Sequence, residues 1–332
     1  MDVAKGSASM NKLLDTNPGK LGMDLLFTPL GDKPTCNKKD CGHCYYLRNY
    51  EEGEPAISAG KVPELIARFK RSGYANIYTI TSELLLAPNW RDILKATGDT
   101  YVNTNGKIIV QKAGILDELA EAGDKQIVIT ANMTKSHEQL KLVDKNTVDR
   151  AFQIINNYNY EHEQMVFSTV ATMIVTSENY DKIGQMCDYA ANVYCADVVK
   201  FVALVPLDEG LRTLSPSRSQ LRTSIGQITA MRRKYEPEEL YIQRDGTMGA
   251  QGLAEGKLAK LCPAGDGIRT VKALEDGSAV TPCIFIPAHQ IGHMENGNIV
   301  IDQKKLDAFL ELKRAALAEG DCPAYAISNG NV

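Results

Sequence analysis

The chain has 332 residues, of which 44% are hydrophobic and 23% are charged, and it carries a net charge of -4 at pH 7. This composition can bury a large core, and it excludes a disordered chain. The mild acidity argues against a nucleic-acid partner, because phosphates call for a face rich in Lys and Arg. The sequence has neither an apolar run long enough to span a membrane nor a signal peptide, so we expect a cytoplasmic enzyme with no membrane partner.

Short β-rich apolar runs alternate with amphipathic helical patterns along the first two thirds of the chain. This order predicts a parallel sheet with crossover helices. The predicted strands are residues 23–27, 76–81, 100–103, 126–131, 166–176 and 198–205. The predicted helices are residues 62–71, 88–96, 115–122, 148–157 and 180–192. The fold class is therefore α/β, a partial (β/α)6 barrel similar to a TIM barrel.

Three cysteines, Cys36, Cys41 and Cys44, crowd into the segment after the first predicted strand, and the next cysteine is Cys187. Three thiolates without a fourth nearby are typical of a 4Fe-4S cluster with one open iron, which can accept a small molecule. Parallel barrels place their chemistry on loops that follow the carboxyl ends of the strands, and this segment lies there.

Other interpretations of these cysteines have a weaker basis. A plant-type two-iron cluster needs a fourth cysteine. A zinc site could recruit His43, but structural zinc is usually held by two well-separated ligand pairs. Disulfides require an oxidising compartment, which nothing in the sequence indicates.

The residues at the ends of the strands resemble motifs of the radical S-adenosylmethionine (SAM) superfamily. Thr81-Ser82-Glu83 stands where that family commonly has G-G-E, and Thr104-Asn105-Gly106 matches its T-N-G. The run I-V-I-T-A-N at 127–132 lies where the family often has I-S-I-D, and residues 137–141 resemble its H-x-x-I-R. The chain departs from the family in the extra residue between Cys36 and Cys41 and in the two glycines that Thr81 and Ser82 replace.

The resemblance implies that SAM binds the open iron and is cleaved to a 5'-deoxyadenosyl radical. Glu83 would anchor its amino group, and Lys141, in place of arginine, would lose bidentate recognition of its carboxylate. The full set of implied SAM contacts is His43, Tyr45, Thr81, Ser82, Glu83, Asn105, Thr130, Asn132, Lys141 and Val205. An electron donor such as flavodoxin or ferredoxin would reduce the cluster.

The C-terminal region has a second group of cysteines. Cys262-Pro263-Ala264-Gly265, Asp276-Gly277 and Thr281-Pro282-Cys283 resemble the hairpin that opens the Twitch and SPASM extensions of the same superfamily. Asp-Gly is a strong hairpin signal, so Cys262 and Cys283 could lie on adjacent strands. A helical pattern at 306–318 then leads to Cys322. We therefore expect a barrel domain at 1–235 and a small hairpin-plus-helix domain at 236–332 with an auxiliary iron-sulfur cluster.

The sequence does not identify the fourth ligand of this auxiliary cluster. Asp321, His289, His293 or another cysteine could complete the site, or one iron could be left free for substrate. Alternatively, the three cysteines are buried thiols without a metal. Cys187 and Cys195 could return a hydrogen atom to a substrate radical, but their positions away from the barrel mouth favour ordinary packing.

The expected function is abstraction of a hydrogen from a small-molecule substrate, leading to oxidation or rearrangement. Few residues precede the first strand, which disfavours an N-terminal peptide-recognition domain and so favours a small molecule. One alternative is epimerisation or crosslinking of a ribosomal peptide. The other is a non-catalytic electron-transfer protein with two clusters.

Overall fold

The computed structural model describes 22–27, 57–74, 76–80, 83–98, 101–124, 126–131, 133–134, 137–138, 140, 142–206, 209–248, 262, 264–265, 267–274, 279–295, 298–319 and 322–328. The segment with Cys36, Cys41 and Cys44 lies outside these residues. No helix among the described residues is long and apolar enough to cross a membrane.

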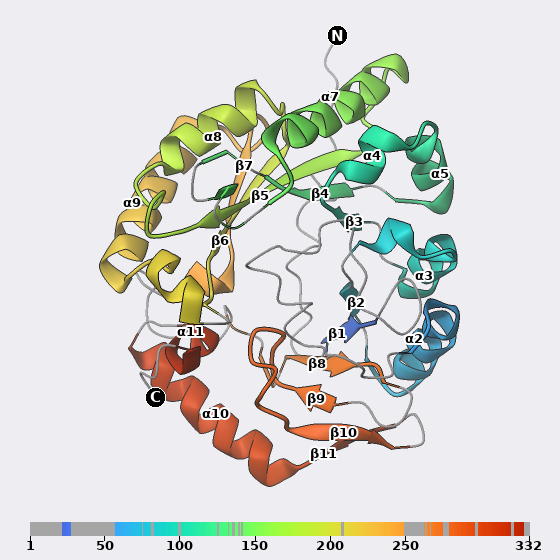
Figure 1. The fold of residues 1–332 in the computed structure, drawn as a ribbon, viewed down its shortest axis with the longest axis vertical. Helices are drawn as coiled ribbons and strands as arrows, with labels where there is room; N and C mark the ends of the chain where they lie inside the picture. The colour runs from blue at the N-terminus through green and yellow to red at the C-terminus, as the bar shows by residue number, and fades with distance from the viewer. Residues whose placement is uncertain are drawn as a thin grey trace.

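The described strands of the barrel lie in two sheets whose helices form the outer layer (Figure 1). β1 (Gly22–Leu26) pairs in parallel with β2 (Asn76–Ile80). The second sheet has the order β3-β4-β5-β6-β7, all parallel. Its strands are β3 (Tyr101–Thr104), β4 (Gln126–Thr130), β5 (Ser168–Val175), β6 (Val198–Ala203) and β7 (Tyr241–Arg244).

The six predicted strands and the five predicted helices are all present. The helices of the outer layer are α2 (Val62–Arg71), α3 (Trp90–Thr97), α4 (Lys107–Gln111), α5 (Ile115–Ala122), α7 (Lys145–Glu161), α8 (Ile183–Asn192) and α9 (Arg218–Lys234). The fold class predicted from the alternating pattern is confirmed.

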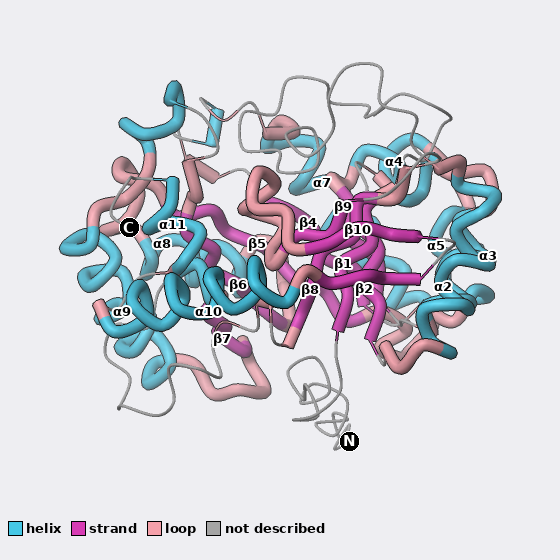
Figure 2. Tube along the Cα trace, turned by 90° about the horizontal axis from the view of Figure 1, so that it is seen from below, coloured by secondary structure: helices cyan, strands magenta, loops and turns pink. Residues whose placement is uncertain are grey.

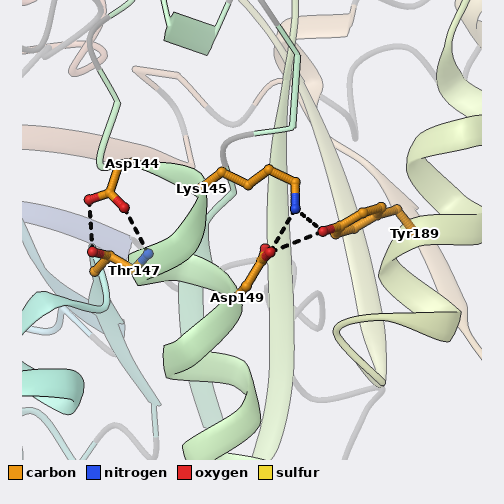
Figure 3. Close-up of polar contacts among 5 residues, drawn as sticks. All are labelled: Asp144, Lys145, Thr147, Asp149 and Tyr189. Carbon is orange, nitrogen blue, oxygen red and sulfur yellow. Dashed lines mark hydrogen bonds and ion pairs between the residues drawn. The ribbon is translucent and has the colours of Figure 1, made fainter.

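α7 and α8 are joined by a polar network on the outside of the barrel (Figure 3). Asp144 caps α7, since its carboxylate accepts hydrogen bonds from the Thr147 amide at 2.9 Å and the Thr147 hydroxyl at 2.7 Å. This cap starts the helix before the predicted residue 148. Lys145 Nζ donates to Asp149 Oδ2 at 2.6 Å and to the Tyr189 hydroxyl of α8. These contacts fix one helix against the next and lie outside the barrel.

β7 and the helix before it were missed by the sequence pattern. α9 begins with a capping box, in which Ser217 and Gln220 satisfy each other's amides. β7 then pairs in parallel with β6, with Lys200 opposite Gln243. The sheet of the barrel therefore continues past residue 235, where we expected the barrel domain to end.

The C-terminal region extends the sheet of β1 on its other edge. β8 (Ile268–Lys272) pairs in parallel with β1, and β9 (Ala279–Thr281) returns antiparallel to β8. The expected hairpin is thus present in its strands, although Asp276-Gly277 lies outside the described residues. The next hairpin, β10 (Gly292–Glu295) with β11 (Asn298–Ile301), was not predicted, although Asn296-Gly297 between its strands is a strong sequence signal.

Two helices complete the C-terminal region, α10 (Gln303–Ala318) and α11 (Pro323–Ser328). α10 covers the predicted residues 306–318 and starts earlier because Asp302 caps it. Figures 1 and 2 show α10 beside the β8–β11 strands, at the end of the molecule where β1 lies. The first strand of the barrel therefore separates β2 from the C-terminal strands.

Gly106, in the Thr104-Asn105-Gly106 turn, has a positive φ of 83° and adjoins α7 closely. A Cβ built at this position would lie 3.0 Å from the Cβ of Ala151, whereas one at Gly123, with φ of 88°, would meet nothing within 4 Å. Only glycine satisfies both the backbone conformation and the space at 106.

We expect Gly106→Ala to destabilise the chain more than Gly123→Ala, because both pay about 1–2 kcal/mol for the left-handed conformation and only Gly106→Ala also displaces α7. Urea unfolding of both variants measures the difference. Equal losses of unfolding free energy would contradict the close packing of this turn against α7.

Candidate functional site

The first feature of the candidate site is a row of polar side chains across the sheet of β1. Tyr78, Asp24, Thr270 and Thr281 stand opposite one another on β2, β1, β8 and β9. Residues in register on neighbouring strands point to the same face of a sheet. Asp24 is half-buried between Met23 and Leu25, which are both fully buried. One face of β1 thus packs in the core, and the other carries a carboxyl group.

A second row crosses the other sheet. Thr130, Thr172, Lys200 and Gln243 stand opposite one another on β4, β5, β6 and β7. All four are half-buried, whereas Ile129, Met173 and Phe201 beside them in the chain are buried. Polar side chains repeated at one register of successive strands are expected where a barrel interior holds a ligand rather than apolar packing.

The two rows face each other, because Asp24 interacts electrostatically with groups of the second sheet. Burial raises the pKa of Asp24 to about 7; Thr270 and Lys200 lower it, and Asp245 raises it. Lys200 Nζ forms an ion pair with Asp245 Oδ2 at 2.9 Å. Burial opposes ionisation of Asp245, but Lys200 holds its pKa below the ordinary value. Two carboxyl groups therefore share this one lysine, and none of these three residues was predicted from the sequence.

Glu83, expected to anchor the amino group of SAM, lies buried just after β2. Its Oε2 accepts hydrogen bonds from the Thr104 hydroxyl at 2.9 Å and the Asn105 amide at 3.0 Å. Its Oε1 is buried and has no hydrogen-bond partner among the described residues. Burial raises the pKa of Glu83 to about 7, against the effect of the Asn105 amide and the Thr104 hydroxyl. An unpaired carboxylate oxygen fits a cationic ligand group such as an ammonium.

The structure thus brings together Glu83 and Asn105 of the expected SAM contacts. Thr130 ends β4 in the second polar row, and Val205 is buried shortly after β6. The other expected SAM contacts and the first cysteine group lie outside the described residues: Cys36, Cys41, His43, Cys44, Tyr45, Thr81, Ser82, Asn132 and Lys141.

His137, which opens the H-x-x-I-R resemblance, has a structural role. Its Nδ1 accepts a hydrogen bond from the Met133 amide at 3.0 Å, so its Nε2 carries the proton that it shares with the Ile174 carbonyl at 2.7 Å. Burial lowers its pKa, which keeps the ring neutral. This histidine ties the segment after β4 to the end of β5.

The three C-terminal cysteines come from separate segments and approach one another. Burial raises the pKa of the Cys283 thiol well above its ordinary value, and Cys322 and Cys262 add to this effect. Cys262 and Cys283 do not lie on strands; they flank the β8–β9 hairpin, where the Gly265 amide donates to the Pro282 carbonyl at 3.0 Å. Cys322 is buried before α11. Asp24 also interacts with Cys283, so this cysteine group adjoins the barrel interior.

Among the described residues, no group of three or more Cys, His, Asp or Glu side chains is arranged as ligands of a metal ion. The thiolates of a cubane cluster stand farther apart than the ligands of one ion, because each binds a different iron. The donor set, three thiols from three segments, fits such a cluster. Of the expected fourth ligands, His289 packs against the ring of Phe309, His293 is exposed on β10, and Asp321 lies outside the described residues.

Neither Cys187 nor Cys195 belongs to either polar row. Cys187 is fully buried in the outer helix α8, where burial raises its pKa to about 12. Cys195 is exposed before β6. The packing of Cys187 in the apolar core agrees with the ordinary structural role favoured from sequence.

The chain matches no protein-family model and no curated protein sequence. Among solved structures it is similar to Streptococcus suis SuiB bound to S-adenosylmethionine, with a TM-score of 0.59 and 16% identity over 92% of this chain and 67% of SuiB. For SuiB bound to the precursor peptide SuiA, the TM-score is 0.58 at 16% identity, over 92% of this chain and 66% of SuiB. For native anSMEcpe with bound AdoMet, the TM-score is 0.57 at 14% identity, over 86% of this chain and 80% of anSMEcpe. The chain therefore has the fold of radical SAM enzymes with SPASM or Twitch extensions.

We expect the pKa of Asp24 to give the metal-free chain a characteristic pH dependence. Because this pKa is raised, the stability it contributes is present below the ordinary value near 4 and is lost as pH rises through about 7. Asp24→Asn cannot ionise, so the unfolding free energy of this variant relative to the original chain should rise between about pH 5 and pH 7 and level off above that range. Urea unfolding at several pH values measures this difference.

Asp144→Asn is the control for that experiment. Thr147 lowers the pKa of Asp144, so this carboxylate is ionised in both folded and unfolded chains throughout the same pH range. The stability difference of the control should therefore not change with pH. A flat difference for Asp24→Asn as well would contradict the burial of its carboxyl group.

Proposed function

We propose that this protein is a radical SAM enzyme that modifies a ribosomally made peptide. The observation that carries the proposal is the position of Glu83, whose unpaired buried oxygen lies just after β2; β2 pairs with β1, the strand that precedes Cys36, Cys41 and Cys44 in the chain. The likeness in fold extends over nearly the whole chain, including the C-terminal region. Cysteine motif, carboxylate and fold support the same activity.

Some of the chain's residues would bind the cluster and SAM, and others would enclose the site. Cys36, Cys41 and Cys44 would hold a 4Fe-4S cluster, and Glu83 would bind the amino group of SAM. When SAM is bound and the cluster is reduced, the cluster and SAM together supply a 5'-deoxyadenosyl radical. Thr130 and Val205 would lie along the cosubstrate, and the apolar core behind both sheets would exclude water, as a reactive radical requires.

The polar rows support a substrate site in the barrel interior, beside the C-terminal cysteine group. Asp24 and Lys200 face each other in the barrel interior, and Asp24 also interacts electrostatically with Cys283. A substrate held there would lie near the expected auxiliary cluster at Cys262, Cys283 and Cys322. That cluster would suit an oxidation, since it could accept an electron from the substrate.

A peptide is the better-supported substrate class, in place of the small molecule expected from sequence. SuiB was solved with the precursor peptide SuiA, and anSMEcpe with the Cp18Cys peptide. The latter structure has a TM-score of 0.56 to this chain at 13% identity. The few residues before β1 do not exclude peptide binding, because the barrel mouth itself could bind the peptide.

We expect Glu83→Gln to weaken SAM binding about 10–100-fold in the cluster-loaded protein, since a charge-assisted hydrogen bond contributes about 1.5–3 kcal/mol. Glutamine can still accept hydrogen bonds from Thr104 and Asn105. Equilibrium dialysis with labelled SAM measures the affinity. Glu118→Gln, at an exposed ion pair with Lys112, is the matched control and should bind SAM normally. Unchanged affinity in Glu83→Gln would remove Glu83 from the SAM site.

The activity itself is tested by anaerobic reconstitution followed by iron and sulfide analysis and an assay for 5'-deoxyadenosine. The original chain should hold about eight irons, from two four-iron clusters, and should cleave SAM after reduction. The variant Cys36→Ala/Cys41→Ala/Cys44→Ala should keep about four irons and form no 5'-deoxyadenosine. Two reducible clusters without SAM cleavage would instead indicate an electron-transfer protein. Zinc in place of iron would exclude both the radical SAM enzyme and the electron-transfer protein.

The substrate class is tested by coexpression with short peptides encoded beside the gene. Modification by this chain but not by the triple-cysteine variant, seen as a change in peptide mass, would support the peptide proposal. Loss of the mass change in Asp24→Asn, with SAM cleavage retained, would place the substrate at the polar rows. If only small molecules stimulate 5'-deoxyadenosine formation, the peptide proposal is wrong and the activity stands.

A further inference from the structure

Three neighbouring strands bring a carboxyl group, a hydroxyl group and an aromatic ring to one register of the barrel interior. Asp24 on β1 stands opposite Thr270 on β8 and Tyr78 on β2. These strands lie side by side, across the interior from β6 (Figure 1). A carboxylate and a hydroxyl both accept hydrogen bonds, and the face of an aromatic ring attracts cations. All three groups can therefore contact a positively charged nitrogen.

Asp24 has no ion-pair partner among the described residues, although a lysine faces it. Lys200 Nζ pairs with Asp245 Oδ2 at 2.9 Å, and the Thr247 amide donates to Asp245 Oδ1 at 3.0 Å. Lys200 acts on Asp24 at longer range, where the opposite charge of Asp245 counters its effect. The pair of Lys200 and Asp245 thus leaves the negative charge of Asp24 available to a ligand.

The Thr270 hydroxyl is a second acceptor on the same face. This residue is 1% exposed, and its Oγ1 has no hydrogen-bond partner among the described residues. It lies near enough to lower the pKa of Asp24, but outside hydrogen-bond geometry. Buried hydroxyl groups in folded proteins normally have a hydrogen-bond partner. A donor that reached both Asp24 and Thr270 would supply one.

The interior beside Asp24 can be reached by water. The side chains of Lys200 and Asp245 are 34% and 26% exposed, although they face Asp24 from inside the barrel. Asp24 and Tyr78 are half-buried as well, whereas Ile77, beside Tyr78 in the chain, is 1% exposed. Polar side chains that point inward and keep this exposure line a space that a ligand group can enter.

We propose that Asp24, Thr270 and Tyr78 bind a positively charged nitrogen of the substrate, carried at the end of a long side chain such as that of lysine or arginine. The inference rests on the proposed function, and it names the substrate group that the polar rows recognise. Asp24 stands opposite Tyr78, two residues before β2 ends, whereas Glu83 follows that strand. The site is therefore deeper in the barrel than the expected site of the SAM amino group. A cation on a flexible apolar stem can reach this depth.

The test compares charged probes with a neutral probe of the same length. The probes are n-butylammonium for lysine, n-butylguanidinium for arginine, and 1-butanol. They are titrated into the full chain after cluster reconstitution and with SAM present, so that SAM occupies Glu83. Saturation-transfer nuclear magnetic resonance gives the dissociation constants without turnover. The variants are Asp24→Asn and Thr270→Val, with Asp144→Asn as the control, because Asp144 caps α7 outside the barrel.

We expect the original chain and Asp144→Asn to bind one of the two cations about 10–100-fold more tightly than 1-butanol, since hydrogen bonds to charged groups are the stronger ones. The cation that binds more tightly identifies the side chain. Asp24→Asn should lose this preference, and Thr270→Val should lower it about 3–10-fold. A merely structural role of Asp24 would weaken the charged and neutral probes equally. If Asp24→Asn does not fold, Thr270→Val carries the test.

The inference is overturned if the original chain shows no preference for the cations, or if the preference survives in Asp24→Asn. It is also wrong if Asp24→Asn loses SAM affinity to the same extent as Glu83→Gln, because Asp24 would then belong to the SAM site. Failure of the proposed function gives a different result. A chain that binds the cations through Asp24 but forms no 5'-deoxyadenosine keeps the cation site and is not a radical SAM enzyme.

Discussion

Buried negative charge is the constraint on which the arrangement of this barrel depends. Asp24, Glu83 and Asp245 are carboxyl groups that the fold removes from water, and Lys200 is the described counter-ion of Asp24 and Asp245. Burial raises the pKa of Asp24 and Glu83, but that of Asp245 falls because Lys200 lies 2.9 Å away. Buried carboxyl groups are costly for an empty protein and favourable for one that binds a cation. SAM carries an ammonium and a sulfonium, so the charge of the interior supports its binding.

The order of the strands places β1 between β2 and the C-terminal hairpin. β1 leads into the segment with Cys36, Cys41 and Cys44, and its other neighbour is β8 of the C-terminal hairpin. Asp24 on β1 therefore stands opposite Thr270 on β8 and also faces Lys200 across the barrel. The C-terminal region is an extension of the same sheet, and a substrate beside Asp24 would meet groups from both regions.

Much of this fold was predictable because the signals are local. Alternating apolar runs and amphipathic helices predicted six strands and five helices, and the turn chemistry of Asp276-Gly277 predicted the hairpin of β8 and β9. β7 was missed because its four residues, Tyr241–Arg244, include polar side chains on the interior face. Asp24 was missed for a similar reason: a single acidic residue in the apolar run Gly22–Leu26 gives no sign of its partners, which lie about 180 and 250 residues later.

The same limit applies to Lys313. In the sequence it is one of several charged residues on an amphipathic helix, and its spacing from Leu306 and Phe309 is the only sign that it lies on the buried face. Only packing places α10 against the Cys262 turn and turns this lysine into a buried donor. Asp24 and Lys313 thus illustrate the same limit, because contacts between residues far apart in the sequence leave no local signal. A buried carboxylate oxygen without a hydrogen-bond partner among the described residues, such as Oε1 of Glu83, marks a place where a bound group would supply the partner.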